Sequence, residues 1–238
     1  MIEIFHRKNK NALFDLGTSD RKQIVDKVIE ESAPSHRFFL MTSLATIITT
    51  LGLITNNAAV VIGGMLVAPF LSPFLSLALG LVSLDLRVIL RSIWVIISAM
   101  AVALLFAFLI AHLVGASATS AEVIARFGYE SQLPLLLIAI AGGTAASYSF
   151  SRTEMAEFLP GTIIAVALLP PLATVSIGLK LLRWDIVQGA GWLFALNFLG
   201  IVAAAMVMFL MMRLYLVKKE ADKAVEKEKK DLEAPKED

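Results

Sequence analysis

The stretch VVIGGMLVAPFLSPF, residues 60–74, places two prolines in the middle of an apolar run, and TIIAVALLPPLATV, residues 162–175, does the same later in the chain. Each belongs to a run of about 20 or more apolar residues, the length that crosses a bilayer as a helix. Proline removes a backbone donor and clashes with the carbonyl four residues earlier. In lipid the freed groups are tolerated only where protein or a water-filled cavity satisfies them. The two stretches therefore predict interrupted membrane helices.

The composition extends this interpretation to the whole chain. The sequence has 238 residues, of which 58% are hydrophobic and 17% charged, against about 45–50% and 25% in a soluble domain. A water-soluble globule is excluded, and we expect an all-α polytopic membrane protein. Runs of suitable length predict six transmembrane helices at about 37–55, 58–84, 88–114, 133–150, 158–182 and 188–213. The polar connection 115–133 is expected to carry a short surface helix near 120–127.

The charges sit mainly outside the predicted spans. We expect a cytoplasmic segment 1–36, a transmembrane domain 37–213 and a charged tail 214–238. In the first segment, Ile24, Val25, Val28 and Ile29 form one apolar stripe. This stripe predicts a short amphipathic helix on the membrane surface or on a neighbouring subunit. With both termini in the cytoplasm, 18 of the 21 Lys and Arg residues fall on the inner side, as the positive-inside rule requires.

The six spans divide into two repeats of three, about 37–114 and 133–213. When the two repeats are aligned with Pro69 against Pro170, a single gap further on brings Asp85 opposite Asp185. Since each repeat has an odd number of spans, the second copy enters the membrane from the opposite side. Inverted repeats with proline-broken second and fifth helices are typical of secondary transporters, which bind their solute near the midplane where helices break.

These breaks predict the site residues. The substrate-binding candidates are Pro69, Ser72, Pro73, Pro170, Pro171 and Thr174. Polar residues elsewhere in or beside the spans are candidate gate or path residues: Thr46, Asn56, Asn57, Asp85, Thr144, Asp185 and Asn197. Less specific interpretations remain open, because prolines can simply kink packed helices, Thr hydroxyls can bond to their own helix, and Asp often caps a following helix.

Several functions are disfavoured by what the sequence lacks. It has no cysteine, which excludes disulfides and thiolate sites, and its three histidines are scattered, so we expect no metal and no cofactor. No enzyme motif is visible, so the protein is not expected to be an enzyme. The near balance of Lys plus Arg, 21, with Asp plus Glu, 20, indicates no nucleic-acid partner. Membrane lipids are the expected surroundings, and the small residues of the spans favour a homo-oligomer.

The segment NNAAVVIGGMLVAPFLSPFLSLALGLVSLDLRVILRS, residues 56–92, resembles the core motif of the family catalogued as domain of unknown function 389. The motif comprises the glycines, Met65-Leu66, Pro69 and Pro73, followed by Gly80 and Asp85. The similarity covers about residues 36–185. It implies a multi-pass protein of a prokaryotic plasma membrane and says little about a substrate. We expect a transporter or channel for a small solute or ion, and the alternative is a non-transporting scaffold or lipid-interacting protein.

Overall fold

The computed structural model describes residues 17–116, 132–150 and 160–217. In these ranges the chain is helical and contains no strand. The helices are α1 (Thr18–Glu31), α2 (His36–Ile54), α3 (Ala58–Val67), α4 (Leu71–Ser83), α5 (Leu86–Leu113), α7 (Gln132–Phe150), α8 (Pro160–Lys180), α9 (Trp184–Met211) and the short 3₁₀ turn η4 (Leu214–Val217). The surface helix expected near 120–127 and most of the tail lie outside the described residues.

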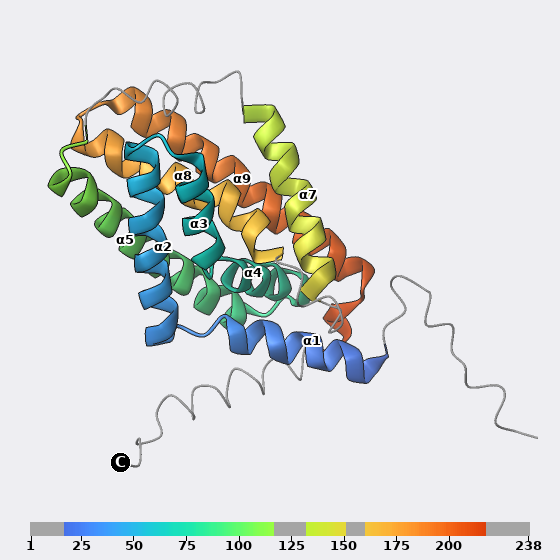
Figure 1. The fold of residues 1–238 in the computed structure, drawn as a ribbon. Helices are drawn as coiled ribbons and strands as arrows, with labels where there is room; N and C mark the ends of the chain where they lie inside the picture. Colours follow the sequence, from blue (N-terminus) through green and yellow to red (C-terminus); the bar gives the residue numbers. More distant parts are fainter. Residues whose placement is uncertain (1–16, 117–131, 151–159, 218–238) are drawn as a thin grey trace, which may run out of the picture.

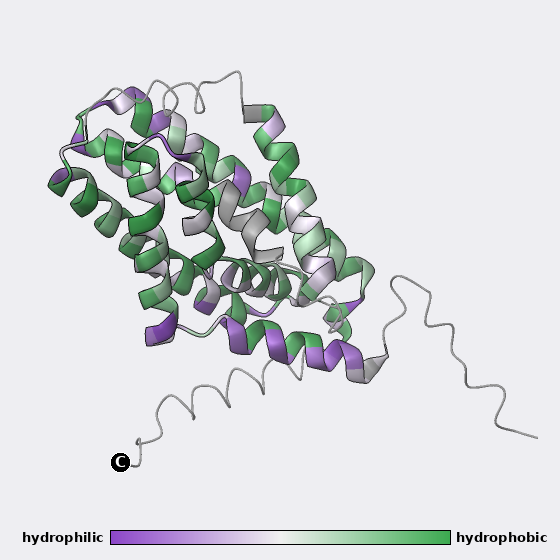
Figure 2. Cartoon of the chain, in the orientation of Figure 1, coloured by the Kyte–Doolittle hydropathy of each residue, from purple (hydrophilic) through white to green (hydrophobic). Residues whose placement is uncertain are grey.

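The long helices make this a multi-pass membrane protein. Among the described residues, α2, α5, α7 and α9 are long and apolar enough to cross a bilayer, and α3 with α4 adds a fifth candidate if the two form one bent span. Figure 2 shows hydrophobic residues along the long helices and hydrophilic residues along α1. The bounds of the helices agree with the sequence-based segments to within about four residues, because continuous hydropathy marks both ends of a span.

The second apolar segment is bent. α3 ends at Val67, α4 begins at Leu71, and the two axes differ by 55°. Pro69 lies in the short link, where its missing N–H and its clash with the preceding turn prevent a straight continuation. Pro73 is the third residue of α4, a position at which a helix has no internal partner for the N–H in any case.

The fifth apolar segment differs from the expectation. α8 runs as one helix from Pro160 to Lys180, with Pro170 and Pro171 inside it, so the break predicted there has to be corrected. Both prolines are fully buried, and α5, α7 and α9 all pack against α8. Neighbouring helices can hold a proline-containing transmembrane helix together even though backbone hydrogen bonds are lost. The prolines therefore remove donors without ending the helix.

The amphipathic helix α1 lies along one end of the bundle (Figure 1). Its four apolar residues are 5% exposed or less, and the helix packs on α4 and η4 of its own chain. Instead of a membrane surface or a second subunit, the stripe thus covers the end of the bundle where α9 finishes. α4 lies between α1 and the bundle and packs on both α5 and α9.

Two turns of the same geometry join α4 to α5 and α8 to α9. In the first, Leu84 has φ 51° and the Asp85 N–H donates to Gly80 O at 2.9 Å. In the second, Leu182 has φ 56° and the Arg183 N–H donates to the oxygen of Gly178 at 2.9 Å. Each pair of equivalent residues is 98 positions apart, as Gly178 follows Gly80.

The shared turn gives a register that differs from the predicted pairing of Asp85 with Asp185. Asp85 precedes α5 as its cap, and Arg183 holds the equivalent position before α9. Asp185 is the second residue of α9 and corresponds to Arg87. The pairing of Pro69 with Pro170, which depends on nearly the same offset, does not follow this geometry either. In the register of the turns, Pro73 corresponds to Pro171.

Candidate functional site

The candidate site lies where α3, α4, α8 and α9 meet. α8 contacts both arms of the bent pair α3–α4, and α9 contacts α4 and α8. Four of the predicted binding residues are buried on these helices, namely Pro73, Pro170, Pro171 and Thr174, and Pro69 is partly buried in the link. The elements that carry them are therefore in contact.

Ser72 does not belong to this group. Its hydroxyl donates to Glu31 Oε2 at 3.3 Å, across the contact between α4 and α1. That contact lies at the end of the bundle covered by α1 (Figure 1). Its place between two prolines predicted a midplane position, but α4 bends by 55° from α3 and its start contacts α1.

A buried pair of hydroxyls on α4 and α5 was missed by the sequence interpretation. The Ser92 hydroxyl donates to Ser76 Oγ at 2.8 Å, and both side chains are 1% exposed or less. Each residue is eight positions from Leu84, at the centre of the turn. Their equal spacing from a tight antiparallel turn was the signal that could have revealed them.

The equivalent pair in the second turn is incomplete. Thr174 and Ala190 stand eight positions before and after Leu182, and both are fully buried. Alanine offers no hydroxyl, and Thr174 Oγ1 has no hydrogen-bond partner. A hydroxyl buried without a partner costs roughly 1–3 kcal/mol in mutational data. Thr174 is therefore the predicted binding residue with the clearest capacity to bond a ligand or a water.

Asn197 lies at mid-depth. It is the fourteenth of the 28 residues of α9 and is 1% exposed. Counting fifteen residues in both directions from Leu182 places it level with Ala167 of α8. The carbonyl of Ala167 is the one that an N–H at Pro171 would have bonded, since helix donors reach four residues back. By this count, an amide side chain and a proline-freed carbonyl lie at the same level, near the middle of α9.

The candidate path threonines bond mainly within their own helices. The Thr46 hydroxyl donates to Thr42 O at 2.7 Å, and the Thr144 hydroxyl donates to Ile140 O at 2.9 Å. This is the helix-internal alternative that the sequence left open. Thr49 Oγ1 differs, because it is buried without a hydrogen-bond partner and lies against Gly64 of α3.

The remaining polar candidates occupy helix ends. Asn56 has φ 52°, and Asn57 Oδ1 accepts from the N–H groups of Ala59 and Val60 at 3.1 and 3.2 Å. These are a turn residue and an N-cap.

The two aspartates also lie at helix ends. Asp85 Oδ1 accepts from the Arg87 N–H at 2.9 Å and caps α5. Asp185 is exposed and pairs with Arg183, whose Nε donates to Asp185 Oδ1 at 2.8 Å. Capping accounts for the hydrogen bonds of Asp85 Oδ1, whereas Asp85 Oδ2 is buried with no hydrogen-bond partner.

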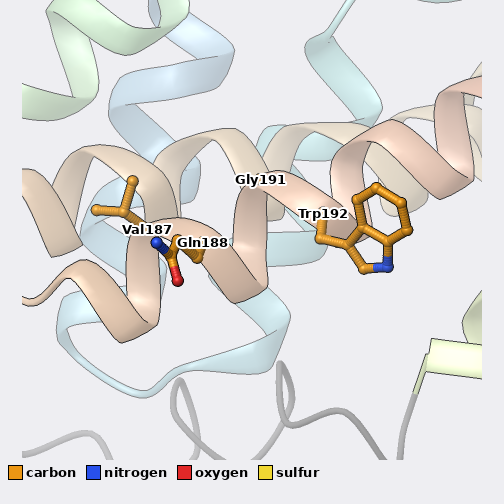
Figure 3. Close-up of a pocket in the computed structure, with 4 residues that line it drawn as sticks. All are labelled: Val187, Gln188, Gly191 and Trp192. Atoms are coloured by element: carbon orange, nitrogen blue, oxygen red, sulfur yellow. The ribbon is translucent and has the colours of Figure 1, made fainter.

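A surface groove lies on the first half of α9. It has a volume of about 610 Å³ and is lined by Val187, Gln188, Gly191 and Trp192, which Figure 3 shows on the α9 ribbon. None of the predicted site residues lines it. In the part of the chain that the structure describes, no group of three or more His, Asp or Glu residues could hold a metal ion.

The fold and this arrangement define a class, an all-helical multi-pass membrane protein with a bent apolar helix pair. The family model described as "Domain of unknown function (DUF389)" matches residues 65–203. The chain therefore belongs to this family, which confirms the resemblance found in the sequence.

An uncharacterised protein of Methanocaldococcus jannaschii is 27% identical over 179 residues, covering 71% of this chain and 52% of that protein. The chain thus spans about half the length of this curated relative. No solved structure matches the chain.

Proposed function

We propose that the protein is a membrane transporter or channel for a small solute or ion, with its site between α4, α8 and α9. The observation that carries the proposal is the bent pair α3–α4, whose two arms meet at 55° inside the apolar bundle. Discontinuous membrane helices expose backbone groups, and transporters use such groups to hold solutes at mid-depth.

A six-span topology supports the proposal. Arg21 Nε donates to Met212 O at 3.1 Å, so the start of α1 and the end of α9 are at the same end of the bundle. A chain that begins and ends on one side crosses the membrane an even number of times. With α3–α4 as one span there are five candidates, and α8, at 21 residues or about 31 Å, supplies the sixth.

The proposal that the protein is a transporter or channel includes an inverted repeat, with an offset of 98 residues between the halves. In this register Pro73 corresponds to Pro171 and Ser76 to Thr174. The contacts between the halves follow the same order, since α5 packs on α8 while α9 packs on α4. In both cases the third helix of one half packs on the second helix of the other.

The burial of α5 and α9 agrees with the same offset. All eight buried residues of α5 have a buried counterpart 98 positions later on α9. The buried residues of α5 are Val88, Ser92, Val95, Ile96, Ala99, Ala103, Ala107 and Ala111. On the outer faces, Trp94 and Trp192 are both exposed, and they too are 98 positions apart. The two halves differ at the mid-helix position, where α5 has the apolar Ala99 and α9 has the amide side chain of Asn197.

The site chemistry favours a small polar solute or a partly dehydrated monovalent ion. Thr174 Oγ1, the Asn197 amide and the carbonyls freed by Pro170 and Pro171 are uncharged hydrogen-bonding groups. No acidic or basic residue stands between Leu168 and Ile177 on α8. Buried charges mark proton relays and charge-coupled pumps, so a mechanism that depends on a deep carboxylate is not part of the proposal.

Flux measurements in proteoliposomes test the proposal. A screen of labelled small ions and polar solutes should find at least one that the wild-type protein admits, and Pro69→Ala and Thr174→Val should reduce that flux about tenfold or more while the protein remains folded. Thr50→Val is the control, because the Thr50 hydroxyl bonds to Thr46 O of its own helix at 2.7 Å. Wild-type liposomes without flux for any solute would contradict transport and favour the scaffold alternative.

A further inference from the structure

The helix α1 makes side-chain contacts with both halves of the protein. Towards the first half, Arg91 of α5 donates from Nη1 to Ser32 Oγ at 3.0 Å and from Nη2 to Ile29 O at 3.2 Å. The Ser72 hydroxyl of α4 donates to Glu31 Oε2. The C-terminal end of α1 is therefore fixed to the starts of α4 and α5.

The other contacts of α1 reach the second half. Lys27 Nζ lies 4.6 Å from the ring centroid of Phe150, the last residue of α7. Arg21 donates to the backbone carbonyl of Met212 just after α9. Both a cation–π contact and a hydrogen bond from a charged group stabilise the packing of the elements that they join. α1 thus bridges α4 and α5 to the ends of α7 and α9.

The apolar side of α1 covers α4. Ile24, Val25, Val28 and Ile29 are 5% exposed or less, and α4 is the helix of the bundle on which α1 packs. α4 is also the arm of the bent pair that leads away from the break at Pro69. α1 therefore covers the arm of the bent pair that follows the break.

We propose that α1 is a lid that clamps the two halves together at the end of the bundle where the chain enters and leaves it, and that it must lift from α4 before the site opens to that side. This proposal rests on the proposed transport function. The polar contacts of α1 described above are side-chain hydrogen bonds and one cation–π contact at one end of the bundle, and its apolar stripe has only four residues. Helices held in this way open locally at a lower free energy than the core of a protein.

Thiol labelling in nanodiscs measures the lifting of α1 independently of transport. The chain has no cysteine of its own, so a single Val28→Cys reports access to the buried side of α1 and a single Gln23→Cys reports the exposed side. We expect Val28→Cys to react at least about tenfold more slowly than Gln23→Cys, and Arg91→Ala to speed the Val28→Cys reaction by about tenfold because two hydrogen bonds to α1 are lost.

The matched control is Arg87→Ala, which removes an exposed arginine one turn earlier on α5. It should leave the labelling of Val28→Cys unchanged. Equal rates for Val28→Cys and Gln23→Cys in the wild-type background, or an Arg91→Ala effect no larger than the control, would overturn the lid. Arg91→Lys, which keeps the charge, should give an intermediate rate and guards against a simple folding defect.

Cross-linking tests whether the lid controls transport. In Glu31→Cys/Ser72→Cys protein, a short reducible bifunctional thiol reagent should join α1 to α4, stop the flux and release it again on reduction. The two single variants, treated identically, should keep their flux. Full flux through the cross-linked protein would overturn the lid. A wild-type protein without flux would overturn the proposed function itself, an outcome that the labelling rates distinguish from failure of the lid.

Discussion

At the scale of single residues, the asymmetry between two equivalent positions is the most informative feature. Ser76 has a hydroxyl partner in Ser92, whereas the hydroxyl of Thr174 has no hydrogen-bond partner among the described residues. The sequence shows which residues carry hydroxyls but not whether a hydroxyl bonds to its own helix, to a neighbour or to no group. For that reason the sequence offered Thr174 as a binding candidate and Thr46 as a path candidate without showing that only the Thr46 hydroxyl bonds to its own helix.

A replacement of Ala190 tests the role of the Thr174 hydroxyl. Ala190→Ser supplies Thr174 with the partner that Ser92 gives Ser76, and should raise the free energy of unfolding by about 1 kcal/mol through one new buried hydrogen bond. The same change should lower flux, because the hydroxyl is then engaged. Thermal unfolding in detergent and flux in liposomes measure the two effects. Higher stability together with unchanged flux would remove Thr174 from the site.

At the scale of helices and turns, the ends of the spans followed from hydropathy, while the course of the chain within them did not. Pro69 marks a real change of direction between α3 and α4, yet Pro170 and Pro171 are accommodated inside α8. The difference comes from packing, because α8 is enclosed by α5, α7 and α9. A proline removes a backbone N–H donor, and the packing of the neighbouring helices determines whether the helix also bends.

The two equivalent turns provide a test at this scale. A Cβ on Gly80 would approach Ile89 to 3.0 Å, and one on Gly178 would approach Ile186 and Val187 to 3.0 Å. Gly80→Ala and Gly178→Ala should therefore each lower the free energy of unfolding by about 1–3 kcal/mol, as overpacking does.

The matched control is Gly63→Ala, since a Cβ there meets nothing within 4 Å. This change should stabilise α3 by up to about 1 kcal/mol, because alanine favours a helix over glycine. Thermal denaturation of the three variants in the same detergent gives the comparison. A large loss at only one of the two turns would argue against equivalent packing of the halves.

At the scale of the whole molecule, the outer faces of the long helices are available to lipid or to another copy. The largest exposed side chains of α5 and α9 include Trp94 and Trp192. We expect a homo-oligomer, because small residues between such side chains allow close helix contact. Native mass spectrometry in mild detergent and from nanodiscs should detect a dimer or trimer. Monomer alone under both conditions would contradict the expectation.

Orientation is the property of the whole molecule on which the inverted repeat depends. The sequence predicted both termini on the cytoplasmic side from its Lys and Arg distribution, and the contact of Arg21 with Met212 puts the start of α1 and the end of α9 at the same end of the bundle. Single cysteines at exposed positions can test this in intact cells. An impermeant maleimide should react with Asn57→Cys and Asp185→Cys, which follow one and five spans in a six-span chain, and should reach Gln23→Cys and Tyr215→Cys only after the cells are opened. These four side chains are exposed, so a failure to react reports the side of the membrane. If Asn57→Cys and Asp185→Cys reacted from opposite faces, one half would contain an even number of crossings. If that half were the first, the second half would enter the membrane from the same side, and the inverted repeat would be ruled out.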